Sequence, residues 1–159
     1  MEPIKIIECP RDAMQGIKPF IPTERKVAYI QSLLRVGFDT IDFGSFVSPK
    51  AIPQMQDTAE VLERLDLSQT RSKLLAIIAN TQGARLASVH SEIQYLGFPF
   101  SISENFQMRN THKTIAESLI TLQEILEIAD KSNKEVVAYL SMGFGNPYGD
   151  PWSVEIVGE

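Results

Sequence analysis

The sequence predicts an α/β protein with a parallel sheet, corresponding to about the first five β/α units of a (β/α)8 TIM barrel. Short apolar runs that suit buried strands alternate along the 159 residues with segments of helical periodicity. The connections are short, as expected for right-handed crossovers between parallel strands. A complete barrel takes about 250 residues, and the sequence contains five strand-like runs. A flavodoxin-like sheet would also have five strands, but it normally closes with a terminal helix, which this sequence does not complete.

The first β/α unit is expected to consist of a strand at Ile4–Glu8 and a helix from Thr23 to about Val36. The segment between them contains glycine and proline, so it is expected to be a loop. Thr23 can cap the helix and Gly37 can end it. The helix is predicted from apolar residues at helical spacing, which are Val27, Ile30, Leu33 and Leu34.

The second unit and the third strand follow the same order. The second strand is expected at Phe38–Phe43, and a long polar loop over residues 44–56 separates it from a short helix with Asp57 or Thr58 as its cap. The third strand, Lys73–Ala79, is a continuous apolar run. Such a run is expected where helices cover both faces of a parallel sheet.

Weaker patterns over residues 82–91 and Tyr95–Phe100 predict the third helix and the fourth strand. Residues 101–110 are polar and are expected to be a loop. The helix from Thr111 to about Asn133 has the clearest pattern in the chain. Its apolar residues form one stripe, made of Ile115, Leu119, Leu122, Ile125, Leu126 and Ala129.

The fifth strand is expected at Glu135–Met142, and residues 143–150 are expected to form a loop because they are rich in glycine. Residues 152–158 hint at the start of a further helix. No linker, low-complexity tract or repeat divides the chain. Residues 1–159 are therefore expected to be a single domain, the N-terminal part of a barrel whose C-terminal part is absent.

The composition favours a globular protein of a reducing compartment. The net charge is -5 and Lys and Arg form no cluster, so no nucleic-acid partner is expected. No apolar stretch approaches the roughly 18 residues of a membrane span, and no targeting segment is recognisable. We therefore expect no membrane partner and a cytoplasmic location. Cys9, the single cysteine, excludes an internal disulfide and is expected to be a small buried filler, and His90 and His112 are expected to have surface or capping roles.

A candidate site follows the first strand. Arg11 supplies a permanent cation, Asp12 a carboxylate that suits a hard metal ion, and Gln15 an amide. Active sites of parallel α/β folds lie at the carboxyl ends of the strands, where these residues would be placed. A plainer interpretation is an exposed Arg-Asp ion pair that contributes about 0 to 1 kcal/mol.

Four motifs resemble one enzyme family. Arg11-Asp12 with Gln15 resembles the first-strand motif of the metal-dependent carbon-carbon lyases and acyl-transferring synthases that share a TIM barrel. Residues 45–55, SFVSPKAIPQM, resemble the second-strand loop of the 3-hydroxy-3-methylglutaryl-CoA lyases nearly letter for letter. Two further stretches match the family in the same order along the chain. The first is Ser103-Glu104 followed by Arg109-Asn110, and the second is Tyr139-Leu140-Ser141 followed by Gly145-Asn146-Pro147-Tyr148.

The resemblance implies an enzyme of leucine degradation and ketone-body formation that cleaves 3-hydroxy-3-methylglutaryl-CoA to acetyl-CoA and acetoacetate with a divalent cation, Mg²⁺ or Mn²⁺. It implies that Arg11 is catalytic, stabilising the developing enolate, and that Asp12 binds the metal. Asp42 stands where the family often carries Glu and is the second catalytic candidate. The substrate-binding candidates are Gln15, Ser45, Ser48, Lys50, Arg109, Asn110, Tyr139 and Ser141. The full-length protein would bind an acyl-CoA and form a homodimer.

Several of these residues also have plainer interpretations. Ser45, Ser48 and Lys50 can simply shape a proline-bounded loop, and Lys50 can alternatively meet a CoA phosphate as a point charge. Arg109 and Asn110 can form the solvated entry to the long helix, with Asn110 as its cap. The Asn-Pro-Tyr sequence after the fifth strand can simply turn the chain.

Alternative functions follow from what the sequence lacks. The family's metal-binding histidine pair, its later asparagine ligand and its catalytic cysteine have no counterpart in these 159 residues, so this chain alone is expected to be inactive. Five barrel strands leave two unpaired edges, so the isolated chain is expected to be marginally stable, to self-associate, or to be part of a longer polypeptide. One alternative is a synthase that condenses acetyl-CoA with a 2-oxo acid, which would share Arg11 and Asp12 but not the loop of residues 45–55. The other is a non-catalytic half-barrel that acts as an interaction module.

Overall fold

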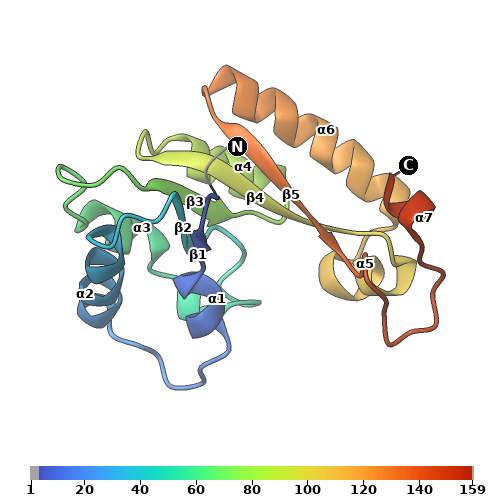
Figure 1. Ribbon diagram of the computed structural model, residues 1–159, viewed down its shortest axis with the longest axis horizontal. Coiled ribbons are helices and arrows are strands. Elements are labelled where there is room, and N and C mark those ends of the chain that lie inside the picture. The colour runs from blue at the N-terminus through green and yellow to red at the C-terminus, as the bar shows by residue number, and fades with distance from the viewer. Residues whose placement is uncertain (1–3, 159) are drawn as a thin grey trace.

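The computed structural model describes residues 4–158 and shows a twisted sheet of five parallel strands with helices packed against it (Figure 1). The strand order is β1-β2-β3-β4-β5, so each strand pairs with the next one in the sequence. A flavodoxin-like sheet would instead have its second strand outside the first. The sequential order is that of a (β/α)8 barrel, and the prediction of about five barrel units is confirmed.

The elements alternate along the chain. The strands are β1 (Ile7–Glu8), β2 (Thr40–Ser45), β3 (Lys73–Ile77), β4 (Ile93–Ser101) and β5 (Glu135–Ser141). The helices that lead from one strand to the next are α2 (Thr23–Leu34), α3 (Thr58–Glu63), α4 (Thr81–Ser88) and α6 (Ile115–Lys131). Shorter elements are α1 (Pro10–Gln15), the 3₁₀ turn η1 (Pro53–Met55), α5 (Glu104–Thr111) and α7 (Val154–Gly158). None of the described helices is both long enough and apolar enough to cross a membrane.

The hydrophobic core lies between the sheet and the connecting helices. Strands β2, β3 and β4 contribute alternate residues to it, as a period of two requires. These strand residues are Ile41, Phe43, Leu74, Ala76, Leu96 and Phe98. The helices contribute Ile30, Leu34, Val61, Leu62, Ala84, Ala87, Ile125 and Ala129. Burying each large side chain contributes about 1.5 to 3 kcal/mol, which is why short helices such as α3 and α4 can dock on the sheet.

The opposite face of the sheet is the inner face of the half-barrel. Leu75 and Ile77 of β3 are 0% and 7% exposed, and they fill the space beside Gly97 of β4. A Cβ atom on Gly97 would lie 2.6 Å from Ile77 Cδ1 and 3.1 Å from Tyr139 Cε2. The missing side chain at position 97 therefore lets side chains from both neighbouring strands meet in the barrel interior.

Two segments that were expected to be loops are short helices beyond the carboxyl ends of the strands (Figure 1). The loop expectation is wrong for α1, whose proline in the first turn has no N–H to leave unpaired. It is also wrong for residues 101–110, because the side chain of Ser103 caps α5 by accepting a hydrogen bond from Phe106 N at 3.1 Å. Strand β1 keeps two paired residues of the five expected.

The long helix α6 begins later than expected. Neither Asn110 nor Thr111 is its cap, because both belong to α5. Thr114 is the cap instead and forms a capping box with Glu117. The Asn110 prediction therefore fails because a separate helix precedes the capping signal.

The buried stripe of α6 also differs from the expected one. Leu119 and Leu126 are 52% and 50% exposed, so the expectation is wrong at these two positions. Ser118 is fully buried in their place, because its hydroxyl accepts a hydrogen bond from Gln107 Nε2 of α5 at 2.6 Å. A hydrogen-bonded hydroxyl can be buried without the penalty of an unpaired one, so helix packing here is partly polar.

The caps expected for α2 and α3 serve another purpose. Pro22, not Thr23, occupies the N-cap of α2. Asp57 does occupy the N-cap of α3, but its side chain makes no capping bond. Its carboxylate accepts hydrogen bonds from Thr23 Oγ1 at 2.8 Å and from Lys26 Nζ at 2.6 Å. These side chains therefore join α2 to the start of α3.

Both edges of the sheet expose apolar side chains. At the β1 edge Ile6 and Ile7 are 59% and 49% exposed, and Leu140 on β5 is 50% exposed. The expectation that half-barrel edges meet solvent thus holds for the described residues. Cys9 lies beside the first edge and is exposed, so the expectation of a buried filler is wrong. It follows the two-residue strand β1, whose outer edge pairs with no other strand within residues 4–158.

The close approach of Gly44 to Thr58 gives a first prediction. A Cβ atom at position 44 would lie 2.5 Å from Thr58 Cγ2, and Thr58 cannot move without losing its hydrogen bonds to Ser45 N and Met55 O. We expect Gly44→Ala to lower the free energy of unfolding by about 1 to 3 kcal/mol in urea denaturation. Gly16→Ala is the control, because no atom lies within 4 Å of its Cβ position, and its effect should be neutral or stabilising. Equal effects of the two variants would contradict the prediction.

Candidate active site

Helix α1 places three polar side chains at the carboxyl end of β1. It has six residues and no side-chain cap, so it would not be stable in isolation. Met14, 5% exposed, anchors it to the core. The four-residue spacing of Arg11 and Gln15 puts both side chains on one face of the helix, and Asp12 lies next to Arg11.

Arg11 forms a forked ion pair with Asp42 of β2. Its Nε donates to the two carboxylate oxygens at 3.1 and 3.2 Å, and its Nη2 donates to Oδ2 at 2.6 Å. The side chain of Asp42 is 0% exposed and that of Arg11 is 11% exposed. Since a buried carboxylate without a partner is strongly unfavourable, this pair determines where the guanidinium lies.

Asp42 faces Arg11 because of its position in β2. Its neighbours Ile41 and Phe43 belong to the hydrophobic core, so the alternation of side chains turns Asp42 to the inner face of the sheet. The pairing of β2 with β3 also shifts between Asp42 and Gly44, which marks a β-bulge. Bulges bend a strand and change the direction of its side chains, and they are common beside active sites.

Asp12 and Gln15 complete a network around Arg11. Arg11 Nη1 donates to Asp12 Oδ1 at 2.9 Å and to Gln15 Oε1 at 3.0 Å, and Gln15 Nε2 donates to Asp12 Oδ1 at 2.8 Å. With the bonds to Asp42, four of the five guanidinium N–H groups are used. The remaining N–H, on Nη2, has no partner among residues 4–158 and is available to a ligand.

Burial and neighbouring charges shift pKa values at this site. Burial raises the pKa of Asp42 above its ordinary value of 3.8, although Arg11 acts to lower it. Burial opposes the charge of Arg11, but the hydrogen bonds and charge of Asp42 leave its pKa raised. Burial, and then the charge of Asp42, raise the pKa of Tyr139 to about 12. The site therefore combines a permanent cation with a phenol that stays protonated at neutral pH.

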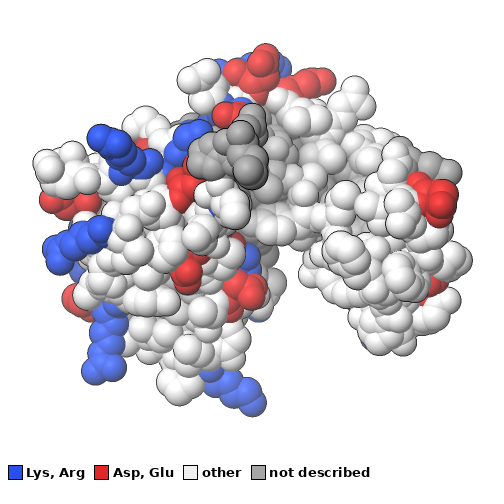
Figure 2. Space-filling view, viewed as in Figure 1, with Lys and Arg blue, Asp and Glu red and all other residues white. Residues whose placement is uncertain are grey.

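A cavity of about 430 Å³ opens beside this network. It lies between the part of the molecule that carries α1 and the part that carries α5, where the surface is hollowed (Figures 1 and 2). Six of the residues predicted from the sequence line it, and these are Arg11, Asp12, Gln15, Asn110, Tyr139 and Ser141. Asp42 supports the site from behind, because its fully buried carboxylate is covered by Arg11.

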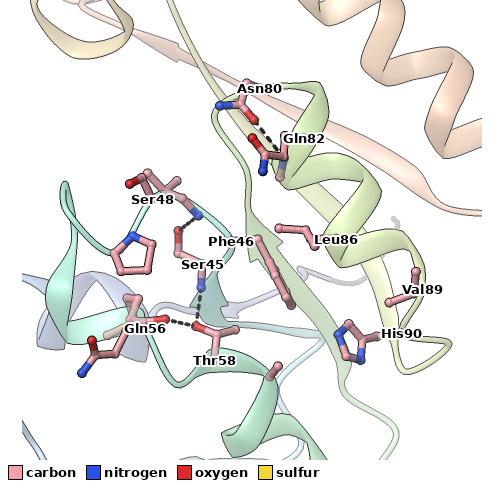
Figure 3. Close-up of a pocket in the computed structure, with 15 residues that line it drawn as sticks. Ser45, Phe46, Ser48, Gln56, Thr58, Asn80, Gln82, Leu86, Val89 and His90 are labelled. Carbon is pink, nitrogen blue, oxygen red and sulfur yellow. Dashed lines mark hydrogen bonds between the residues drawn. The ribbon is translucent and has the colours of Figure 1, made fainter.

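Ser45 and Ser48 line a different cavity, of about 470 Å³, between the β2 loop, α3 and α4 (Figure 3). The Ser45 hydroxyl donates to Ile77 O at 3.3 Å and accepts from Val47 N at 3.1 Å. The Ser48 hydroxyl accepts from Lys50 N at 3.3 Å. Both serines thus shape the loop, as in their plainer interpretation. Val47 lines both cavities, so this loop is the wall between them.

Lys50 and Arg109 are exposed and line neither of these two cavities. The guanidinium of Arg109 lies 5.0 Å from the centre of the Tyr148 ring, a cation–π contact. The loop that carries Tyr148 is folded around Asn146, whose Oδ1 accepts from Tyr148 N and Asp150 N, both at 3.0 Å. Arg109 therefore contacts the β5 loop rather than the cavity beside Arg11.

The described residues supply one candidate metal ligand and not a complete metal site. The Asp12 side chain is 64% exposed, and its Oδ2 has no hydrogen-bond partner in the described part of the chain. No group of three or more His, Cys, Asp or Glu residues that could hold a metal occurs within residues 4–158. A hard dication needs several oxygen ligands, so Asp12 fits such an ion only as one ligand among others.

The contribution of α5 was missed in the sequence analysis. Phe106 and Thr111 of this helix line the cavity. A usable signal was present, because Ser103 followed by Glu104 is a typical helix start. The signal was weak, because Gln107 is the single buried residue of α5 and the helix has no apolar stripe.

Comparison with curated proteins shows similarity to lyases, although no protein-family model matches the chain. The chain is 33% identical over 150 residues to the cytoplasmic 3-hydroxy-3-methylglutaryl-CoA lyase of Rattus norvegicus, covering 92% of this chain and 43% of the relative. It is 34% identical over 148 residues to a hydroxymethylglutaryl-CoA lyase of Bacillus subtilis, covering 93% and 49%. The mitochondrial lyase of Arabidopsis thaliana is 32% identical over 149 residues, covering 93% and 31%.

Solved structures show the same similarity in three dimensions. The HMG-CoA lyase of Bacillus subtilis superposes with a TM-score of 0.89 at 34% identity, over 97% of this chain and 51% of that one. The enzyme of Brucella melitensis gives a TM-score of 0.90 at 30% identity, over 99% and 55%. An Acinetobacter baumannii HMG-CoA lyase in complex with coenzyme A and 3-methylmalate gives 0.88 at 30% identity, over 97% and 50%. The resemblance inferred from the motifs is confirmed, and the chain spans about half the length of most of these proteins.

The raised pKa of Asp42 predicts how its charge affects stability with pH. The folded chain holds the Asp42 proton more tightly than the unfolded chain, so this contribution to stability is complete below about pH 3.8 and is lost as the pH rises through the folded-state pKa. Asp42→Asn has no titrating group at this position. Between about pH 3 and 7, the free energy of unfolding of the wild-type chain should therefore fall relative to that of the variant. Urea denaturation across this range measures it.

Arg11→Met is the companion variant for this experiment. It removes the hydrogen bonds and the positive charge that lower the pKa of Asp42 and leaves the effect of burial, so the pKa should rise further. Carbon-13 NMR of the carboxyl group measures this pKa directly. A constant difference between the wild-type chain and Asp42→Asn, or a lower Asp42 pKa in Arg11→Met, would contradict the assignment.

Proposed function

We propose that this chain forms one side of the active site of a lyase that cleaves 3-hydroxy-3-methylglutaryl-CoA to acetyl-CoA and acetoacetate. The observation that carries the proposal is the Arg11 guanidinium, fixed by Asp42 at the edge of a cavity, in a chain similar to such lyases. The lyase names of these relatives favour cleavage over the synthase alternative.

Arg11 has the chemistry that the difficult step requires. Removing the proton from the tertiary hydroxyl and breaking the adjacent carbon-carbon bond leaves a carbanion next to the thioester. Its charge is delocalised onto the thioester oxygen, where a fixed cation stabilises it. The Nη2–H of Arg11 that has no partner within residues 4–158 supplies a donor for that oxygen, and the guanidinium cannot lose its charge in the process.

Asp42 acts in this proposal by holding Arg11, not by contacting the substrate. It is fully buried, and its two oxygens are occupied by Arg11 Nε and Nη2. The family often carries Glu at this position, and the shorter Asp side chain still reaches the guanidinium at 2.6 Å. A fixed partner orients the cation before the charge develops, so no reorganisation is needed in the reaction.

The remaining cavity walls supply groups for the oxygen-rich acyl part of the substrate. Gln15 and Asn110 carry amides, Ser141 a hydroxyl, and Tyr139 a phenol that is protonated at neutral pH. Such groups donate to carboxylate and carbonyl oxygens. Lys50 is exposed beside the cavity-lining residue Ala51, and we place a CoA phosphate near it. The Acinetobacter relative in complex with coenzyme A supports an acyl-CoA ligand.

A divalent cation, Mg²⁺ or Mn²⁺, belongs to the proposal with Asp12 as one of its ligands. When bound, such an ion supplies Lewis-acid chemistry to the hydroxyl and carboxylate oxygens of the substrate. The Asp12 side chain is exposed and its Oδ2 has no partner within residues 4–158, which suits this role, and Arg11 and Gln15 orient the carboxylate through Oδ1. Residues 4–158 contain no group of three or more His, Cys, Asp or Glu residues that could hold a metal, so its further ligands would come from outside this range.

The chain spans about half of its relatives, so the complete activity is proposed for the polypeptide that carries the whole barrel. Residues 1–159 would then be the N-terminal part of one barrel domain, and the full-length protein would be a homodimer. The chain alone would lack the rest of the site and would not turn over substrate.

The proposal predicts the effect of removing the cation in the full-length polypeptide. Arg11→Gln should lower the rate of acetoacetate release from 3-hydroxy-3-methylglutaryl-CoA by about 10² to 10³, because one preorganised donor to a developing oxyanion is lost. Arg85→Gln is the matched control, since Arg85 is exposed on α4 away from this cavity. An Arg11→Gln enzyme within tenfold of wild type, or condensation of acetyl-CoA with a 2-oxo acid by the wild type, would refute the proposed role.

Metal binding separates the roles of Arg11 and Asp12. In calorimetric titration of the full-length polypeptide with Mn²⁺, Asp12→Ala should weaken binding by 10-fold or more, because a charged ligand is lost. Arg11→Gln should weaken binding less than Asp12→Ala does, because it removes a hydrogen-bond partner that orients the ligand and leaves the ligand itself in place. Equal effects of the two substitutions would show that the assigned roles are wrong.

A further inference from the structure

We propose that Gln54, in the loop after β2, is a positioning residue for Arg11, and that it acts by clamping the chain that leaves α1. The consequence for catalysis rests on the proposed function, but the clamp itself rests on contacts in the described chain. Gln54 lies outside both cavities discussed above and touches none of Arg11, Asp12 or Asp42 through a hydrogen bond.

The side-chain amide of Gln54 is devoted to one partner segment. Its Nε2 donates to Ile17 O at 2.7 Å and to Pro19 O at 3.0 Å, and its Oε1 accepts from Ile21 N at 2.8 Å. Both donor hydrogens are used, and the residue is 3% exposed. All three bonds reach over a sequence separation of 33 to 37 residues to the connection between α1 and α2.

This connection controls the position of α1. Ile17 N donates to Met14 O at 3.0 Å, so Ile17 continues directly from the last turn of the helix. The Gln54 bond to Ile17 O therefore fixes the chain two residues after Gln15, which in turn bonds Arg11 Nη1. A six-residue helix without a side-chain cap has little stability of its own, so its position depends on such attachments.

A buried ion pair holds Gln54 in turn. Lys26 is 2% exposed, and its Nζ donates to the backbone oxygen of Gln54 and to Asp57 Oδ1 at 2.6 Å. The same ammonium lies 4.1 Å from the centre of the Phe20 ring, within the clamped connection. Burying a lysine is unfavourable unless its charge and its donors are satisfied. The contacts that satisfy Nζ tie α2 to the loop after β2, to the start of α3 and to the α1–α2 connection.

Gln54 belongs to the motif of residues 45–55 but lines neither cavity, and the clamp is the function that we infer for it. The loop of residues 45–55 carries Gln54 near its end, and the clamp transmits the position of this loop to α1 and hence to Arg11. Gln54 would hold α1 at the distance from β2 at which the Arg11 fork meets Asp42.

The test uses the Nε–H signal of Arg11 in nitrogen-15 NMR of the chain, assigned by its disappearance in Arg11→Lys. In the wild type this proton is bonded to Asp42 and should exchange slowly with water. In Gln54→Met, which keeps the volume and removes all three amide bonds, we expect exchange at least about tenfold faster and a shifted resonance. Gln54→Glu keeps the acceptor for Ile21 N but places a carboxylate oxygen against Ile17 O and Pro19 O, so it should show a change in the same direction that is at least as large.

Lys134→Met is the matched control for loss of stability alone. Lys134 is 8% exposed and donates to His90 O and Ile93 O, away from α1. It should lower the melting temperature but leave the Arg11 signal unchanged. An unchanged Arg11 signal in folded Gln54→Met or Gln54→Glu, or the same change in Lys134→Met, would overturn the inference. No substrate or turnover enters this measurement, so its failure is distinct from a failure of the proposed function.

Discussion

A carboxylate with no exposed surface must be paired, and Asp42 meets this requirement through Arg11. Because Arg11 belongs to α1, the pair joins the first β/α unit to the second strand at the carboxyl end of the sheet. Asp12 and Gln15 are then held by the same guanidinium. The geometry of the whole site therefore follows from the need to neutralise one buried charge.

The loops at this end of the sheet are fastened to one another by polar groups. The Ser45 hydroxyl reaches Ile77 O of the next strand, and Gln54 reaches back to the connection after α1. Hydrogen-bonded loops of this kind are more rigid than solvated ones, because each buried group would lose a partner if the loop moved. A site built on loops can thus be held nearly as firmly as one built on strands.

The central strands β2 and β3 were predictable from the sequence because nearly all of their residues are buried, so apolar runs such as Lys73–Ala79 stand out. The short helices were not, since α1 and α5 are held largely by side-chain hydrogen bonds, such as those of Arg11 and Ser103, which leave no periodic pattern. The motif residues Arg11 and Tyr139 were found and do meet at one cavity. Ser45 was placed with them because it belongs to the motif of residues 45–55, but its hydroxyl is used by the backbone groups Ile77 O and Val47 N.

The sequential order of the strands also bears on how the chain folds during synthesis. Ile7 pairs with Thr40, and Thr40 pairs with Lys73, so each partner is separated from the last by one β/α unit. Contacts over such short separations form quickly, because little loop-closure entropy is lost. As the polypeptide leaves the ribosome, none of the four strand pairs in the described sheet requires a partner that is distant in the sequence. The most recently completed strand always offers its edge to the strand that is made next.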